Sequence, residues 1–252
     1  MKLMAKRSDL EDRIRELTES VQARDAFIAT IGHELRNPMT PIAGQVSLLL
    51  HLVRKGKPTQ ERLVAGLERL EWLIELYMKR ATTLLDVSRI TTGKLTLELT
   101  PVDVSEVLLE VAAALKPLAD HARSPVNVVA PEGLVGNYDR LAVEQIVENL
   151  FSNAIKYGAG KPIEATAENA GDAVILRVLD RGIGISEADQ ARIFDRFERA
   201  VGRDERAGGF GVGLWIVCQL AEALGGKVTV ESTVGKGSIF TVILPKAPRD
   251  GT

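Results

Sequence analysis

The strongest constraint on the fold is a pair of long amphipathic segments in the first third of the chain. Apolar residues recur at helical spacing from Ile28 to Val53 and again from Leu63 to Leu85. Residues 54–58 between them are basic and contain a glycine and a proline, which end a helix. Two long helices joined by a short loop form an antiparallel hairpin. Its apolar stripe is too wide for one hairpin to bury, so we expect two copies to pair as a four-helix bundle.

A shorter repeat precedes the hairpin. Its apolar positions alternate in steps of four and three, as in a coiled coil between two chains: they are Leu10, Ile14, Leu17 and Val21. Two heptads also fit a single amphipathic surface helix. We expect a coiled-coil linker over residues 1–24.

The pattern changes after Gly93, where we place a domain boundary. Leu95, Leu97 and Leu99 alternate with polar residues, which predicts a strand. Further along we expect helices over 104–119, 139–157, 187–194 and 212–224, and strands over 125–130, 161–168, 172–180, 226–232 and 237–244. Several of these strands are neighbours in sequence. The fold class is therefore α+β, with a mixed sheet covered by helices on one face.

Composition excludes several classes of function. The 252 residues carry a net charge of -2, which gives no electrostatic case for binding nucleic acid. A single cysteine, Cys218, allows no internal disulfide and fits a reducing compartment. No apolar stretch approaches the roughly 20 residues that span a bilayer. We expect a cytoplasmic chain without membrane contact, and the sequence is compatible with its being the soluble part of a larger sensor.

One histidine has a reactive context. His33 lies between Ile31 and Leu35 of the apolar stripe, so it faces outward. Neutral imidazole is a good nucleophile, the neighbouring Glu34 can take its proton, and Asn37, one helical turn on, can orient a water. A surface histidine on a kinked helix explains this segment equally well.

A polar helix face suggests a metal and a phosphate group. Asn149, Asn153 and Lys156 are spaced four and three apart, so they share one face of the expected helix. Amide oxygens can bind Mg²⁺ beside phosphates, and the lysine can meet phosphate charge. A solvated polar stripe is the alternative, although asparagine is a poor residue for the middle of a helix.

Two glycine segments follow. Asp180 ends an expected strand and precedes Gly182 and Gly184, which let the backbone approach a flat ring whose amino group the carboxylate can bind. Residues 186–189 then resemble a helix-starting capping box. A turn that merely contains an aspartate is the alternative.

The second glycine segment precedes an apolar helix and directs backbone N–H groups and a helix N-terminus toward phosphates. Its glycines include Gly209, Gly211 and Gly213. Between the two segments, phenylalanines can anchor a lid from which Arg196 or Arg199 contacts a terminal phosphate. An ordinary glycine-rich loop and surface helix are the alternative.

Together these segments resemble the histidine kinase family over residues 25–245. Its H box resembles residues 33–38, and its N box resembles residues 149–157. Its two glycine boxes resemble residues 180–184 and 209–213. Its F box resembles residues 193–199, and its closing strand resembles residues 237–245. The resemblance implies that Tyr157 lies in the nucleotide site and that Thr241 supports Asp180. It departs at Gly158, where threonine is frequent, and at Glu198, where an aromatic residue is frequent.

The resemblance implies a homodimeric dimerisation and phosphotransfer domain over 25–93, followed by a two-layer α/β sandwich of the Bergerat type over 94–247. It implies Mg²⁺ and ATP as cofactors, phosphorylation of His33, and phosphotransfer to an aspartate of a response regulator receiver domain, with phosphatase activity as a further expectation. A topoisomerase or mismatch-repair ATPase is a rival, but it places a glutamate base where this chain has Asn149. A non-enzymatic nucleotide-dependent scaffold is the second rival.

Overall fold

The computed structural model describes residues 13, 32, 38–56, 59–196 and 211–247. Contacts divide the chain into two units, Met1–Ser88 and Arg89–Thr252, which we describe separately. The expected coiled coil lies outside the described residues.

The first unit contains the expected hairpin. Residues 38–55 are helical, and α2 spans Gln60–Thr91. The two helices touch where Gln45 Nε2 donates to the carbonyl of Gly66 at 2.9 Å, and a Cβ on Gly66 would lie 2.4 Å from a methyl of Leu49. Much of the apolar stripe remains 39–61% exposed within one chain: Val46, Leu50, Val53, Leu67, Ile74 and Leu85. None of the described helices is long and apolar enough to cross a bilayer.

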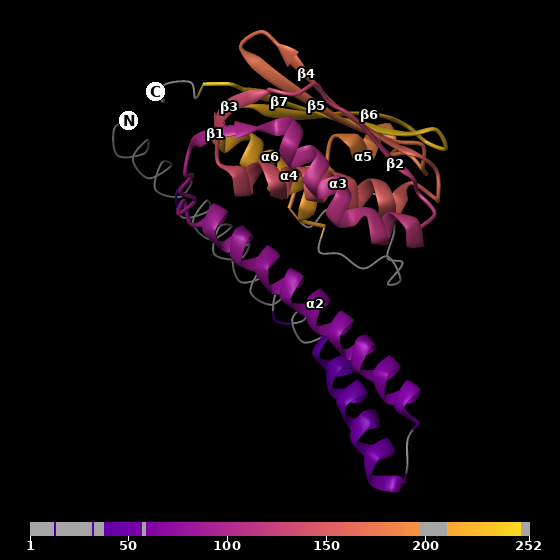
Figure 1. The fold of residues 1–252 in the computed structure, drawn as a ribbon. Coiled ribbons are helices and arrows are strands. Elements are labelled where there is room, and N and C mark those ends of the chain that lie inside the picture. Colours follow the sequence, from indigo (N-terminus) through magenta and orange to yellow (C-terminus); the bar gives the residue numbers. More distant parts are fainter. Residues whose placement is uncertain (1–12, 14–31, 33–37, 57–58, 197–210, 248–252) are drawn as a thin grey trace. The chain divides into compact units, whose positions relative to one another are not determined.

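The second unit is the expected sandwich, with a mixed sheet on one side and helices on the other (Figure 1). The five-stranded sheet runs in the order β2 (Val126–Val129), β4 (Ile163–Ala170), β5 (Ala173–Asp180), β7 (Gly237–Pro245) and β6 (Lys227–Thr233). Only β2 and β4 pair in parallel. A small second sheet pairs β1 (Thr100–Asp103) with β3 (Val135–Tyr138). The helices are α3 (Val104–His121), α4 (Arg140–Tyr157), the short α5 (Glu187–Gln190) and α6 (Gly213–Ala223).

The core follows from the periodicity of the sequence. Alternate residues of β5 are buried, and the apolar face of α4 packs toward them. This is expected, because side chains on one face of a strand repeat every two residues and those on one face of a helix repeat every 3.6 residues. The fully buried side chains include Leu150, Phe151, Leu176 and Ile216. Each such side chain stabilises the fold by about 1.5–3 kcal/mol.

Two expectations about elements are wrong, and one strand was not expected. Residues 95–99 form no strand, because the N–H of Glu98 donates to the Asp139 carboxylate at 2.8 Å rather than to a neighbouring strand. The strand begins instead at Thr100 and pairs with β3, which sequence reasoning missed because its four residues include a glycine and an asparagine. The helix α5 ends at Gln190, and turns follow it.

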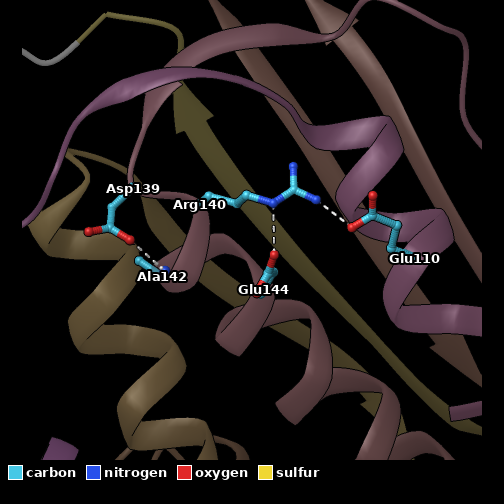
Figure 2. A network of polar contacts seen from close by, with 5 residues as sticks. All are labelled: Glu110, Asp139, Arg140, Ala142 and Glu144. Atoms are coloured by element: carbon cyan, nitrogen blue, oxygen red, sulfur yellow. Dashed lines mark hydrogen bonds and ion pairs between the residues drawn. The ribbon is translucent and has the colours of Figure 1, made fainter. Parts of the chain in front are cut away.

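The start of α4 is fixed by polar contacts to three parts of the unit. Asp139 caps the helix by accepting from the N–H of Ala142 at 3.0 Å. The next residue, Arg140, pairs with Glu110 on α3 and, at 2.9 Å, with Glu144 one turn along α4 (Figure 2). The N–H of Glu98 also donates to Asp139. Together these contacts join the segment before β1, α3 and the start of α4.

Candidate nucleotide-binding site

The helix α4 presents the expected polar face. Asn149 donates through Nδ2 to the carbonyl of Gln145 at 2.8 Å, and its Oδ1 accepts no hydrogen bond from the described residues. That oxygen lies 2.8 Å from the position that a Cβ on Gly213, the first residue of α6, would take. Asn153 is half-buried one turn further along. The amide oxygen of Asn149 therefore faces the second glycine segment.

Asp180 is a buried carboxylate at the end of β5, with 6% of its surface exposed. It accepts from the N–H of Gly182 at 2.8 Å, and Ser238 lies directly opposite it on β7. Burial raises the pKa of Asp180, and the polar groups of Gly182 and Ser238 oppose the rise. A carboxylate offers about four acceptor positions, so positions beyond the one that Gly182 fills can accept from a ligand.

The two glycines after Asp180 are required by packing within the protein. A Cβ on Gly182 would lie 1.9 Å from the carbonyl oxygen of Tyr157, and Ile183 donates its N–H to that same oxygen at 3.2 Å. Gly184 has a φ of +68°, and its Cβ would lie 2.0 Å from the carbonyl of Thr233. These contacts account for both glycines within the protein, and the expectation that they also let the backbone approach a ligand ring stays a prediction. They let the loop fit between α4 and the β6–β7 hairpin.

A hydroxyl that sequence reasoning missed ties this loop to the hairpin. Ser232 Oγ accepts from the N–H of Ile185 at 2.8 Å, donates to the carbonyl of Gly237 at 2.8 Å and lies 3.0 Å from Ser238 Oγ. Gln190 Nε2 donates to the carbonyls of Ile185 and Ser232, each at 3.0 Å. The expected capping box beside this group is confirmed in its first half, because Ser186 Oγ accepts from the N–H of Asp189 at 3.2 Å. The Asp189 carboxylate accepts from the hydroxyl of Ser186 at 2.6 Å.

The expectation that Thr241 supports Asp180 is wrong. Thr241 pairs with Arg177 on β5 and Thr229 on β6, whereas Ser238 lies opposite Asp180. Side chains alternate between the two faces of a strand. Positions 238 and 241 differ by an odd number, so their side chains lie on opposite faces.

Two expected phosphate-binding cations have aromatic neighbours. The guanidinium of Arg196 lies 4.9 Å from the ring centroid of Trp215 on α6, a partner that sequence reasoning missed. Lys156 Nζ lies 4.8 Å from the ring centroid of Tyr157. Both distances are typical of cation–π contacts.

The start of α6 is suited to an anion. Its N-cap, Val212, makes no side-chain capping bond, and Gly211 just before it has a φ of +66°. Unsatisfied N–H groups at a helix start attract negative charge. Five expected site residues lie outside the described part of the chain: His33, Glu34, Asn37, Arg199 and Gly209.

The glycine segments converge on one helix, because α4 contacts the first through Tyr157 and the second through Asn149. These residues are eight positions apart, or about 12 Å along a helix. A buried acceptor for a base lies at one end, and an amide oxygen with a helix N-terminus lies at the other. This arrangement fits an elongated ligand with a flat base and a charged tail.

The chain matches two protein families. Residues 23–93 match the His Kinase A (phospho-acceptor) domain. Residues 138–248 match the family described as histidine kinase-, DNA gyrase B-, and HSP90-like ATPase.

Curated relatives carry both regions. The circadian input-output histidine kinase CikA of Synechococcus elongatus is 32% identical over 256 residues, which cover 94% of this chain and 33% of CikA. The sensor histidine kinase GacS of Pseudomonas protegens is 35% identical over 249 residues, covering 94% of this chain and 26% of GacS. The chain thus spans about a quarter to a third of these two relatives.

Solved structures agree with the fold. The Acinetobacter baumannii histidine kinase AdeS has a TM-score of 0.65 at 24% identity, covering 85% of this chain and 98% of that chain. Full-length ShkA in complex with AMPPNP has a TM-score of 0.62 at 26% identity, and the match covers 88% of this chain and 46% of the ShkA chain. From the two family matches and these relatives, the chain belongs to the sensor histidine kinases and carries their phosphoacceptor and ATP-binding regions.

Proposed function

We propose that this chain transfers the γ-phosphoryl group of ATP to His33 and then to an aspartate of a response regulator. The observation that carries the proposal is that α4 contacts both glycine segments. One helix can therefore organise the base at one end and the phosphates at the other. The domain boundaries that we propose are 1–24, 25–93 and 94–247.

Asp180 is the proposed acceptor for the adenine amino group. Gly182 fills one acceptor position of this buried carboxylate, and the remaining positions can accept from a ligand. The ShkA structure with AMPPNP, at 26% identity, supports an adenine nucleotide as the ligand. We place Tyr157 and Lys156 beside it, at the end of α4.

The oxygens of Asn149 and Asn153 are the proposed ligands of a magnesium ion. The donor set fits, since Mg²⁺ prefers oxygen, and the Oδ1 of Asn149 accepts no hydrogen bond in the part of the chain that the structure describes. The ion would neutralise charge on the nucleotide phosphates. The start of α6, with Gly209, Gly211 and Gly213, would supply N–H donors to the same phosphates.

The choice of asparagine over glutamate has a consequence for the reaction. An amide cannot remove a proton from water, so Asn149 does not promote hydrolysis. We propose that the nucleotide persists until His33 attacks. A lone pair of its imidazole forms the N–P bond, the bond to the ADP oxygen breaks, and Glu34 takes the ring proton. Arg196 and Arg199 would meet the charge on the transferred group.

The partners follow from the hairpin. Its exposed apolar stripe supports a homodimer, because pairing with a second copy would bury it. The histidine kinase ThkA, which shares the fold with a TM-score of 0.59 at 23% identity, was solved in complex with the response regulator TrrA. That complex is the precedent for the regulator in our proposal. Asn37 would orient water when the regulator is dephosphorylated.

The test is labelling with ATP that is radioactive at the γ-phosphate. We expect acid-labile label on the wild-type chain, none on His33→Gln, and transfer to a cognate receiver domain. His51→Gln is the matched control, because His51 is exposed on the same hairpin. Full labelling of His33→Gln would rule out the assignment.

A further inference from the structure

The hydroxyl of Ser232 has no place in the function proposed so far, although it makes three polar contacts close to Asp180. It lies one residue before the end of β6 and contacts the loop after Asp180, the start of β7 and Ser238. We propose that Ser232 is a positioning residue of the nucleotide site, which locks the loop and Ser238 together so that Asp180 presents its carboxylate to adenine in one orientation. This inference rests on the proposed function of the same site.

The first step is the link from Asp180 to Ser232. Ser238 lies opposite Asp180 in the sheet and opposite Ser232 on its other side. Its hydroxyl is one of the groups that lower the pKa of Asp180, and it lies 3.0 Å from Ser232 Oγ. A hydroxyl has one proton, so Ser238 can only accept from Ser232 while it donates to an ionised Asp180.

The second step is the link from Ser232 to the loop. Its oxygen accepts from the N–H of Ile185, while its one proton is shared between the carbonyl of Gly237 and Ser238 Oγ. Without this hydroxyl, the amide of Ile185 loses its acceptor and Ser238 loses the neighbour that holds its rotamer. Both losses act on groups that flank Asp180.

The third step separates the side chain of Ser232 from its backbone. Gln190, at the end of α5, donates to the backbone carbonyl of Ser232 and to that of Ile185. A substitution at position 232 leaves those acceptors in place. The variant therefore tests the hydroxyl alone and keeps the anchor of α5.

The test is isothermal titration calorimetry of the full chain with Mg-ADP and Mg-GDP. We expect Ser232→Ala to weaken ADP binding about tenfold, which corresponds to about 1.4 kcal/mol. GDP binding should change little, because the loss falls on the group that reads adenine, so the preference for ADP shrinks. Ser232→Thr keeps the hydroxyl and should restore most of the affinity.

Two further measurements separate positioning from general damage. Ser124→Ala is the matched control, because its buried hydroxyl has no hydrogen-bond partner in the described part of the chain; ADP affinity should match the wild type. Hydrogen exchange at the amide of Ile185 should speed up about tenfold in Ser232→Ala.

The outcomes distinguish the inference from the function on which it rests. Wild-type ADP affinity in Ser232→Ala, or equal losses for ADP and GDP that Ser232→Thr does not restore, would overturn the role of Ser232 alone. A wild-type chain that binds no adenine nucleotide would overturn the proposed function, and this inference with it.

Discussion

Asp139 is a residue whose two carboxylate oxygens perform two separate tasks. Oδ1 caps α4 by accepting from the N–H of Ala142 at 3.0 Å, and Oδ2 accepts from the N–H of Glu98 at 2.8 Å. The side chain is nearly buried, with 9% of the residue exposed. Replacing it with alanine therefore leaves two N–H groups without their acceptors.

The magnitude follows from these two contacts. Loss of an N-cap costs about 1 kcal/mol, and a hydrogen bond to a charged group contributes about 1.5–3 kcal/mol. We expect Asp139→Ala to lower the free energy of unfolding by roughly 2–4 kcal/mol. Asp139→Asn keeps one acceptor oxygen and should lose about half of that amount.

The assay is urea unfolding followed by far-ultraviolet circular dichroism, with the midpoint compared between variants at equal slope. Asp120→Ala is the control, because Asp120 is exposed and pairs with Lys116 at 2.9 Å on the surface of α3. Surface pairs contribute about 0–1 kcal/mol. A midpoint for Asp139→Ala that matches the control would refute the reasoning, as would equal losses for alanine and asparagine.

Three further outcomes are expected. Burial raises the pKa of Tyr138 from 10.0 to about 12, so the folded state favours the neutral phenol. The free energy of unfolding should therefore be constant below pH 10 and should fall as the pH rises from about 10 to 12. Thermal melts of Tyr138→Phe should show a smaller fall over the same pH range. Gly213→Ala places a Cβ 2.8 Å from the Oδ1 of Asn149, so calorimetry should show Mg-ADP binding weakened at least tenfold, with unchanged affinity contradicting the proposed metal site. Trp215→Leu removes the ring beside Arg196 and with it a cation–π contact that contributes about 0.5–1 kcal/mol. Trypsin should then cut after Arg196 about two- to fivefold faster, as followed by mass spectrometry. An unchanged rate of cleavage would refute the contact.

Local patterns in the sequence were enough to predict most of the elements. Helices at 104–119 and 139–157 are confirmed as α3 and α4, and the strands at 172–180 and 237–244 as β5 and β7. In each case the apolar period and the flanking aspartates or glycines lie within one segment. Neighbouring residues along the chain supply the whole signal.

Errors occurred where a residue's partner is distant in sequence. The strand expected at 95–99 is replaced by a contact from Glu98 to Asp139, which is 41 residues away. The hydroxyl beside Asp180 belongs to Ser238 rather than Thr241, because strand register decides which face each residue occupies. Periodicity identifies a strand without stating its register.

The sequence by itself determined the kind of site: amide oxygens on one helix, a carboxylate at a strand end and two glycine segments. Only the tertiary structure decided which groups meet. It placed Ser232 beside Ser238 and Ile185, and it aimed the amide oxygen of Asn149 at Gly213. The physical reason is that hydrogen bonds depend on distances of about 3 Å, and such distances between remote segments are set by the packing of the whole sandwich.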